Sequence, residues 1–146
     1  MNAVQEKSST STDGQTITQR ILVVDDEQDM AKALKVRLKA NGYHVVIASD
    51  SVEAFVKAGK EKPDLIICVV DATNLRLSLR LALELKATGA PVMIALNMVD
   101  IARARGITID VEGLARDFGL AIVPTVAVEK SGVDVLIKFI DQAAAE

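Results

Sequence analysis

The run from Leu65 to Val70 is the feature of this chain that most constrains its fold. These six residues, LIICVV, carry no charge and are mostly aliphatic. A continuous run of this kind is typical of a strand buried on both faces at the centre of a parallel sheet. The polar residues that follow, 71–74, fall at the carboxyl end of this strand, where open α/β sheets bind their ligands. We therefore expect functional residues around Asp71.

The rest of the chain alternates short apolar runs with amphipathic segments. The pattern predicts strands at 21–24, 43–48, 64–70, 92–97 and 120–126, and helices at 28–40, 51–60, 74–86, 111–118 and 132–144, with a short helix or turn at 98–105. Repeated strand–helix units with right-handed crossovers predict a three-layer α/β fold. We expect a five-stranded parallel sheet of order 2-1-3-4-5, flavodoxin-like, with helices on both faces.

One segment gives conflicting signals. Leucines alternate strictly between Leu75 and Leu85, which by pattern favours a strand. We predict a helix, because the segment consists of helix formers, contains no β-branched residue and is longer than a usual strand. The apolar face of this helix is unusually wide, so we expect weak self-association through it. In the last helix, the spacing predicts that Val135, Leu136, Phe139 and Ile140 face the core.

Length and composition limit the classes of protein that the chain can represent. With 146 residues, it is expected to form a single α/β domain over 20–146. Residues 1–19 are rich in Ser, Thr and Gln and are predicted to be a flexible tail. The net charge of −3 gives no electrostatic footprint for nucleic acid. No apolar run approaches the roughly 20 residues that span a bilayer, so no membrane partner is expected.

The only cysteine, Cys68, lies inside the central apolar run. A single cysteine cannot form an internal disulfide, which favours a reducing, cytoplasmic location. We interpret its thiol as buried and inert. No catalytic residue, required cofactor or definite partner is predicted.

The first half of the chain resembles bacterial response-regulator receiver domains of the CheY-like type. The resemblance is carried by ILVVDDE at 21–27, GYHVVIASDSVEA at 42–54 and KPDLII at 62–67. It implies that Asp25 and Asp26 help to hold Mg²⁺ and that an aspartate near the end of the third strand accepts phosphate. That acceptor position is Val69, which has no nucleophilic oxygen, so acyl-phosphate chemistry is not expected there.

Three acids, Asp25, Asp26 and Asp71, are predicted to approach one another at the carboxyl edge of the sheet. Carboxylate oxygens are the ligands of hard cations, so the sequence predicts a weak Mg²⁺ or Ca²⁺ site. The alternative is that these side chains cap local turns and form a solvated acidic edge.

The second half resembles the G domain of the bacterial ferrous-iron transport GTPases, the FeoB family. The matching stretches are VVDATNLRLSLRLALEL at 69–85, the segment 91–119 and IVPTVAVEKSGVDVL at 122–136. The resemblance implies that Asn97 and Asp100 read guanine, because a carboxylate can accept two bonds from the base. It also implies that Thr125, Val126 and Ala127 form a second guanine loop.

Other parts of a GTPase are absent from the sequence. It contains no G-x-x-x-x-G-K-[ST], so no phosphate-binding loop and no loop lysine. We therefore expect no GTPase activity, and guanine binding that is weak and vestigial.

Both families have a similar central strand, so the two halves are predicted to meet within 64–68. We interpret the chain as an engineered fold chimera that lacks both activities, with a receiver-like part at 20–67 and a fragment of a P-loop fold at 68–146. The alternatives are a weak guanine-nucleotide or Mg²⁺-binding module, a pseudo-receiver signalling domain, and a receiver that is phosphorylated on Asp71.

Overall fold

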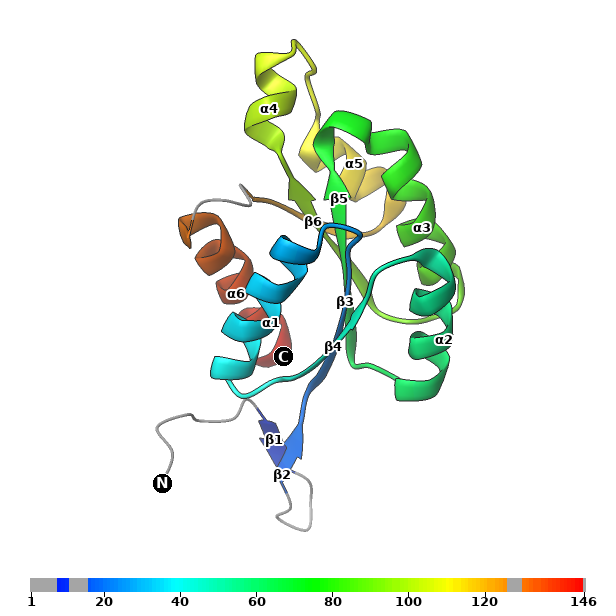
Figure 1. Cartoon of the computed structure of the whole chain (residues 1–146), viewed down its shortest axis with the longest axis vertical. Coiled ribbons are helices and arrows are strands. Elements are labelled where there is room, and N and C mark those ends of the chain that lie inside the picture. Colours follow the sequence, from blue (N-terminus) through cyan, green and yellow to red (C-terminus); the bar gives the residue numbers. More distant parts are fainter. Residues whose placement is uncertain (1–7, 11–15, 126–129, 146) are drawn as a thin grey trace. The chain divides into compact units, whose positions relative to one another are not determined.

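Five parallel strands form one sheet in the order β4-β3-β5-β6-β7 in the computed structural model, which describes residues 8–10, 16–125 and 130–145. Counted along the chain, these five strands have the order 2-1-3-4-5, which confirms the predicted α/β fold (Figure 1). The strands are β3 (Arg20–Val24), β4 (His44–Ala48), β5 (Leu65–Asp71), β6 (Val92–Asn97) and β7 (Ala121–Pro124).

Six α-helices and one 3₁₀ turn connect and follow these strands within the described residues. They are α1 (Gln28–Ala40), α2 (Ser51–Glu61), η1 (Ala72–Asn74), α3 (Leu75–Ala87), α4 (Val99–Ala104), α5 (Val111–Phe118) and α6 (Lys130–Ala145). The leucine-rich segment is helical, as its helix-forming composition predicted and against its alternating pattern. None of the described helices is long and apolar enough to cross a membrane.

The chain divides into two compact units, 1–66 and 67–146. We predicted a single domain over 20–146, with its two parts meeting between residues 67 and 68. The boundary between the units falls inside β5, one residue from that predicted junction.

In the first unit, β3 and β4 pair in parallel, from Arg20 opposite His44 to Val24 opposite Ala48. Helices α1 and α2 cover opposite sides of this pair (Figure 1). Because both sides are covered, four consecutive residues of β3, 21–24, are buried. Leu34 of α1 is completely buried and adds to this core.

The segment that we predicted to be a flexible tail contains two short strands. β1 (Ser8–Thr10) and β2 (Thr16–Thr18) pair in antiparallel fashion. β2 alternates threonine with isoleucine, and β-branched residues of this kind favour extended backbone. At the end of the predicted tail, the backbone carbonyl of Gln19 accepts a hydrogen bond from His44 N at 2.9 Å.

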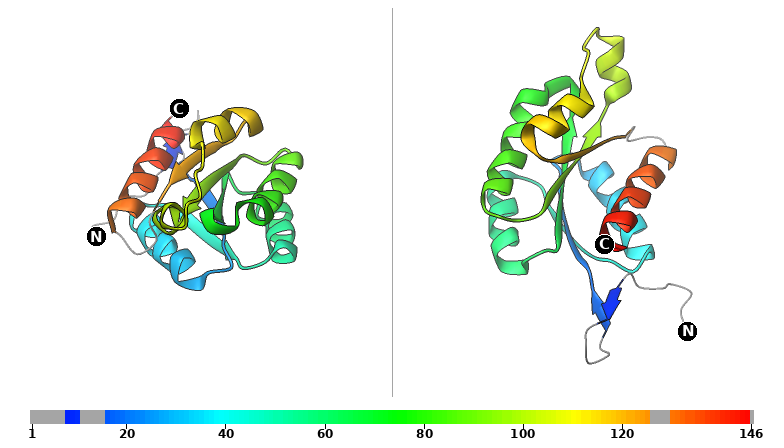
Figure 2. Two further views of the ribbon diagram at one scale, coloured as in Figure 1. Left: turned by 90° about the horizontal axis from the view of Figure 1, so that it is seen from above. Right: turned by 180° about the vertical axis from the view of Figure 1, so that it is seen from behind.

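In the second unit, β6 and β7 pair in parallel, with Met93 opposite Ala121 and Leu96 opposite Pro124. Helices α3 and α5 lie on one side of this pair and α6 on the other (Figure 2). Helix α3 buries Leu79, Ala82 and Leu85 against this core.

The buried face of α6 differs from the predicted one. Leu136 and Ile140 are buried as expected, whereas Val135 is 54% exposed and Phe139 is 38% exposed. Ile137, at 6% exposure, takes part in the core instead. The helix is therefore rotated so that the positions i, i+1 and i+4 face inward.

Candidate functional site

The predicted acidic pair lies directly after β3, and its two members have different surroundings. Asp25 is 5% exposed, whereas Asp26 is exposed. One carboxylate oxygen of Asp25, Oδ1, accepts a hydrogen bond from the backbone N–H of Glu27 at 2.9 Å. The other, Oδ2, is buried and has no hydrogen-bond partner among the described residues.

Burial strongly changes the pKa of Asp25. Loss of solvation raises the pKa of its carboxyl group to about 7. The hydrogen bond from Glu27 N–H works against this increase, and the negative charges of Asp26 and Glu27 add to it. Asp25 therefore changes its protonation state near neutral pH.

Asp71 lies at the end of β5 and caps the turn that follows. Its Oδ1 accepts hydrogen bonds from Thr73 N at 2.8 Å and from Thr73 Oγ1 at 2.6 Å. This is the local capping arrangement that we considered as the alternative to a metal site. The carboxylate is half-buried, and its capping oxygen is already occupied.

Within the described residues, no group of three or more His, Cys, Asp or Glu side chains is arranged to hold a metal ion. Asp25 and Asp26 belong to the first unit and Asp71 to the second. Metal binding by these three acids stays a prediction.

The predicted guanine-reading residues begin at the end of β6. Asn97 is the last residue of this strand and is 3% exposed. Its side-chain oxygen is buried and has no partner among the described residues. An unpaired buried carbonyl oxygen costs roughly 1–3 kcal/mol, so it is a strong acceptor for any N–H group that reaches it.

Met98 turns the chain from β6 into α4. It has a φ of +64°, in the left-handed region that L-residues rarely adopt. This turn places Asp100 in the first turn of α4, with an exposed side chain. This backbone conformation could not be predicted from the sequence, because position 98 is not a glycine.

Thr125 follows β7 directly and is 2% exposed. Its backbone N–H donates to the carbonyl oxygen of Leu96 at 2.7 Å, and its hydroxyl donates to the same oxygen at 3.4 Å. Because Leu96 precedes Asn97, these bonds hold Thr125 beside the end of β6 that carries Asn97. Val126 and Ala127, the other predicted members of the second loop, lie outside the described residues.

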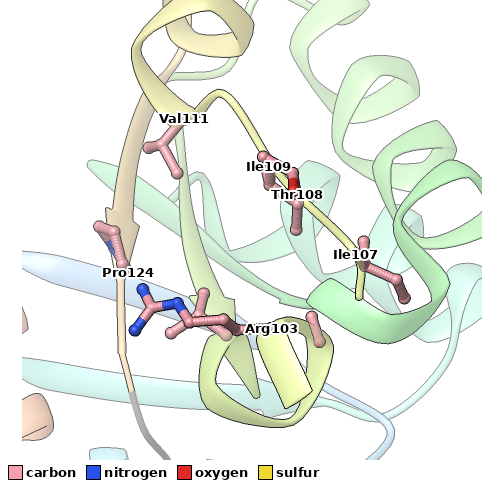
Figure 3. A pocket seen from close by; sticks show the side chains of 8 residues that line it. Arg103, Ile107, Thr108, Ile109, Val111 and Pro124 are labelled. Carbon is pink, nitrogen blue, oxygen red and sulfur yellow. The ribbon is translucent and has the colours of Figure 1, made fainter. Parts of the chain in front are cut away.

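A cavity of about 230 Å³ next to α4 was not predicted from the sequence (Figure 3). It is lined by Val99, Ala102 and Arg103, by residues 107–109, and by Val111 and Pro124. Its residues come from separate stretches of the second unit, so no local motif could have indicated it.

A second cavity, of about 170 Å³, lies in the first unit. It is lined by polar residues that include Asp25, Lys32, Ser49 and Glu53. Glu53 accepts hydrogen bonds from Ser49 N and Oγ and pairs with Lys57, and these contacts hold its pKa below the ordinary value.

Comparison with known proteins assigns the fold to one class. The sequence model of the family described as "Ferrous iron transport protein B" matches residues 47–140. The solved G domain of FeoB from Methanococcus jannaschii superposes with a TM-score of 0.72 at 29% identity, over 88% of this chain and 98% of that one. The fold is therefore that of a GTP-binding G domain.

Curated relatives agree with this assignment. The Fe(2+) transporter FeoB of Salmonella typhimurium is 43% identical over 79 residues, which are 54% of this chain and 10% of the relative. That of Escherichia coli K12 is 40% identical over 82 residues, 56% of this chain and 11% of the relative. The chain belongs to the ferrous iron transport protein B family and spans about a tenth of the length of these relatives.

One solved structure of a response regulator shares the fold of this chain but little of its sequence. A response regulator from Thermotoga maritima superposes with a TM-score of 0.66 at 21% identity, over 89% of this chain and all of that one. The family match begins at residue 47, before the predicted junction within 64–68, so similarity to FeoB extends into the first unit.

Proposed function

We propose that the chain retains a guanine-reading edge at the ends of β6 and β7 but does not hydrolyse GTP. The observation that carries this proposal is the buried side-chain oxygen of Asn97, which has no partner among the described residues. Thr125 lies close by, since its backbone N–H donates to the carbonyl oxygen of Leu96, the residue before Asn97. Asp100, exposed at the start of α4, supplies the carboxylate that would accept the two N–H groups of guanine.

We also propose that the chain is an engineered chimera of a receiver-like first part and a FeoB-type second part. Two observations support this reading. The boundary between the compact units, after Ile66, lies within the predicted junction. The curated relatives match 79 to 82 residues of this chain, close to the length of the second unit.

The expected affinity follows from what the sequence lacks. The sequence has no G-x-x-x-x-G-K-[ST], so no backbone loop or lysine is available for the phosphates of a nucleotide. Base contacts alone should give a Kd on the order of 1 mM. Because the phosphates contribute nothing, guanosine and GDP should bind equally well.

This equality is the basis of a direct test. The full chain would be titrated with guanosine, GDP and ADP while the amide signals of residues 97–100 and 125 are followed by NMR. We expect guanosine and GDP to shift these signals with Kd values within about twofold, and ADP to leave them unchanged. No shift with guanosine at its solubility limit would contradict the proposal.

Substitution of the carboxylate tests its role separately. Asp100→Asn removes the charged acceptor and should weaken guanosine binding by about tenfold or more. Asp117→Asn provides the matched control, since Asp117 is exposed on α5, outside the proposed edge. Equal losses in the two variants would argue against reading of guanine by Asp100.

We further propose that the chain accepts no phosphoryl group. Val69 offers no nucleophilic oxygen, and Oδ1 of Asp71 is held by two hydrogen bonds from Thr73. Beryllofluoride with Mg²⁺ should leave the amide spectrum unchanged around Asp71, and GTP with Mg²⁺ should release phosphate at the rate of buffer alone. Perturbed signals at residues 71–74, or protein-dependent release of phosphate, would overturn this proposal.

A further inference from the structure

The cavity next to α4 is separate from the proposed guanine edge. None of Asn97, Asp100 and Thr125 lines it. It opens between α4, the extended segment 107–110 and the end of β7 (Figure 3). An occupant of this cavity would therefore be a different ligand from the nucleotide, and the inference drawn from it goes beyond the proposed function.

The body of the cavity is apolar. Its walls consist mainly of aliphatic side chains, and no acidic side chain lines it. Apolar cavities of about 150 Å³ take up a benzene molecule. At about 230 Å³, this cavity has room for a benzene-sized body and a small polar group.

The polar group of the cavity is a cation. Arg103 lies in the last turn of α4, and its guanidinium group extends toward Pro124 on the opposite wall (Figure 3). Arg103 is exposed and forms no ion pair or hydrogen bond with any described residue through its side chain. A guanidinium group presents a fixed fork of N–H donors that matches a carboxylate.

Backbone donors lie on the same wall. The N–H groups of Thr108 and Ile109 make no backbone hydrogen bond with the described part of the chain, whereas Ile107 N donates to the carbonyl oxygen of Ala102 at 2.9 Å. The hydroxyl group of Thr108 also belongs to this wall. The cavity thus combines an apolar body with donors and a positive charge, and it lacks an acidic side chain that would bind a cationic ligand.

We propose that this cavity binds a small organic acid, with its apolar body among Val99, Ile109 and Val111 and its carboxylate on the guanidinium group of Arg103. A neutral apolar compound would leave the guanidinium group unused. A cationic compound would be repelled by it.

Phenylacetate is a suitable probe, because it joins a benzene ring to a carboxylate. The full chain would be titrated with phenylacetate and with phenylacetamide, its neutral analogue, with amide chemical shifts as the readout. We expect phenylacetate to shift the amides of residues 103 and 107–109 and phenylacetamide to bind about tenfold more weakly. Equal binding of both probes, or shifts only at residues 97, 98, 100 and 125, would overturn the proposal.

Two variants separate recognition by Arg103 from general attraction of an anion. Arg103→Gln should weaken phenylacetate binding by about tenfold, since it removes the charged fork. Arg105→Gln removes an equal charge from an exposed residue that does not line the cavity, and binding should stay within about twofold of wild type. Similar losses in the two variants would show nonspecific attraction and contradict the assignment.

Discussion

At the scale of single residues, Asp25 is a carboxyl group whose surroundings differ strongly from water. Its carboxyl group is buried next to two further acids, and its pKa is about 7, above the ordinary value of 3.8. The folded protein therefore holds a proton that the unfolded chain has already released between these two values. The free energy of unfolding must fall as pH rises through this range and level off above about pH 7.

The first prediction concerns this pH dependence. Between pH 5 and pH 8, the Asp25 carboxyl group should lower the free energy of unfolding by roughly 3 kcal/mol, at 1.36 kcal/mol per pKa unit. Asp25→Asn should remove this loss, because asparagine stays neutral while its oxygen still accepts from Glu27 N–H. Urea unfolding at the two pH values measures the difference.

Asp26→Asn is the control for this experiment. Asp26 is exposed and contributes only through its charge, so the variant should keep most of the pH dependence. If the Asp25→Asn variant loses stability between pH 5 and pH 8 as steeply as wild type, the burial of Asp25 is not the cause.

A second prediction at this scale concerns Cys68. Its thiol is 3% exposed, and burial raises its pKa to about 12. The thiolate is the reactive form, so the folded protein should react with Ellman's reagent at pH 8 far more slowly than the protein in urea. The absorbance of the released thiolate gives both rates, and equal rates would show that Cys68 is accessible.

At the scale of elements, the sequence predicted the five strands of the sheet and nearly every helix. These predictions were correct where capping residues or helix-forming composition indicated the structure locally. Asp50 and Glu53 predicted the start of α2, and both side chains act there as hydrogen-bond acceptors: Asp50 Oδ1 from Glu53 N at 2.8 Å, and Glu53 from Ser49 N at 2.6 Å. Composition likewise decided correctly between helix and strand for α3.

The predictions were wrong where tertiary packing determines the structure. In α6, the predicted face of Val135, Leu136, Phe139 and Ile140 fits the helical period as well as the observed face does. Which face turns inward depends on the strands that the helix meets, and these are distant in sequence. The cavity next to α4 was missed for the same reason, because its lining residues come from separate stretches of the second unit.

A third prediction tests the start of α2. Asp50→Ala should lower the free energy of unfolding by about 1 kcal/mol, because Glu53 N–H loses its acceptor. Asp50→Asn should cost much less, since asparagine is about as good an N-terminal cap. Urea midpoints of the two variants would measure the difference, and equal costs would mean that the charge of Asp50 matters more than its hydrogen bond.

At the scale of the whole molecule, the sheet order could be predicted because right-handed crossovers leave few alternatives. The boundary between the compact units lies one residue from the predicted junction of the two resemblances, and the junction itself stays a prediction. The division into two compact units could not be predicted, because the central run reads as one uninterrupted buried strand. Guanine reading by Asn97, Asp100 and Thr125 stays a prediction, and it rests on the resemblance alone.

A fourth prediction follows from the place of β5. This strand supplies Leu65 and Ile66 to the first unit and its remaining residues to the second. We therefore expect both units to unfold in a single transition. Fluorescence of Tyr43, the only tyrosine, reports on the first unit, and the reactivity of Cys68 reports on the second. Urea midpoints that differ between the two probes would contradict a single transition.

The boundary inside β5 also has a consequence at the level of the gene. In the fusion that we propose, the change of parent occurs between the codons for Ile67 and Cys68. This point lies just upstream of Val69, where the receiver resemblance places the phosphate acceptor. A crossover a few codons further downstream would have kept an equally apolar strand together with that aspartate. The choice of exchange point within one short stretch of DNA thus separates a chain that inherits a signalling site from one that inherits only its framework.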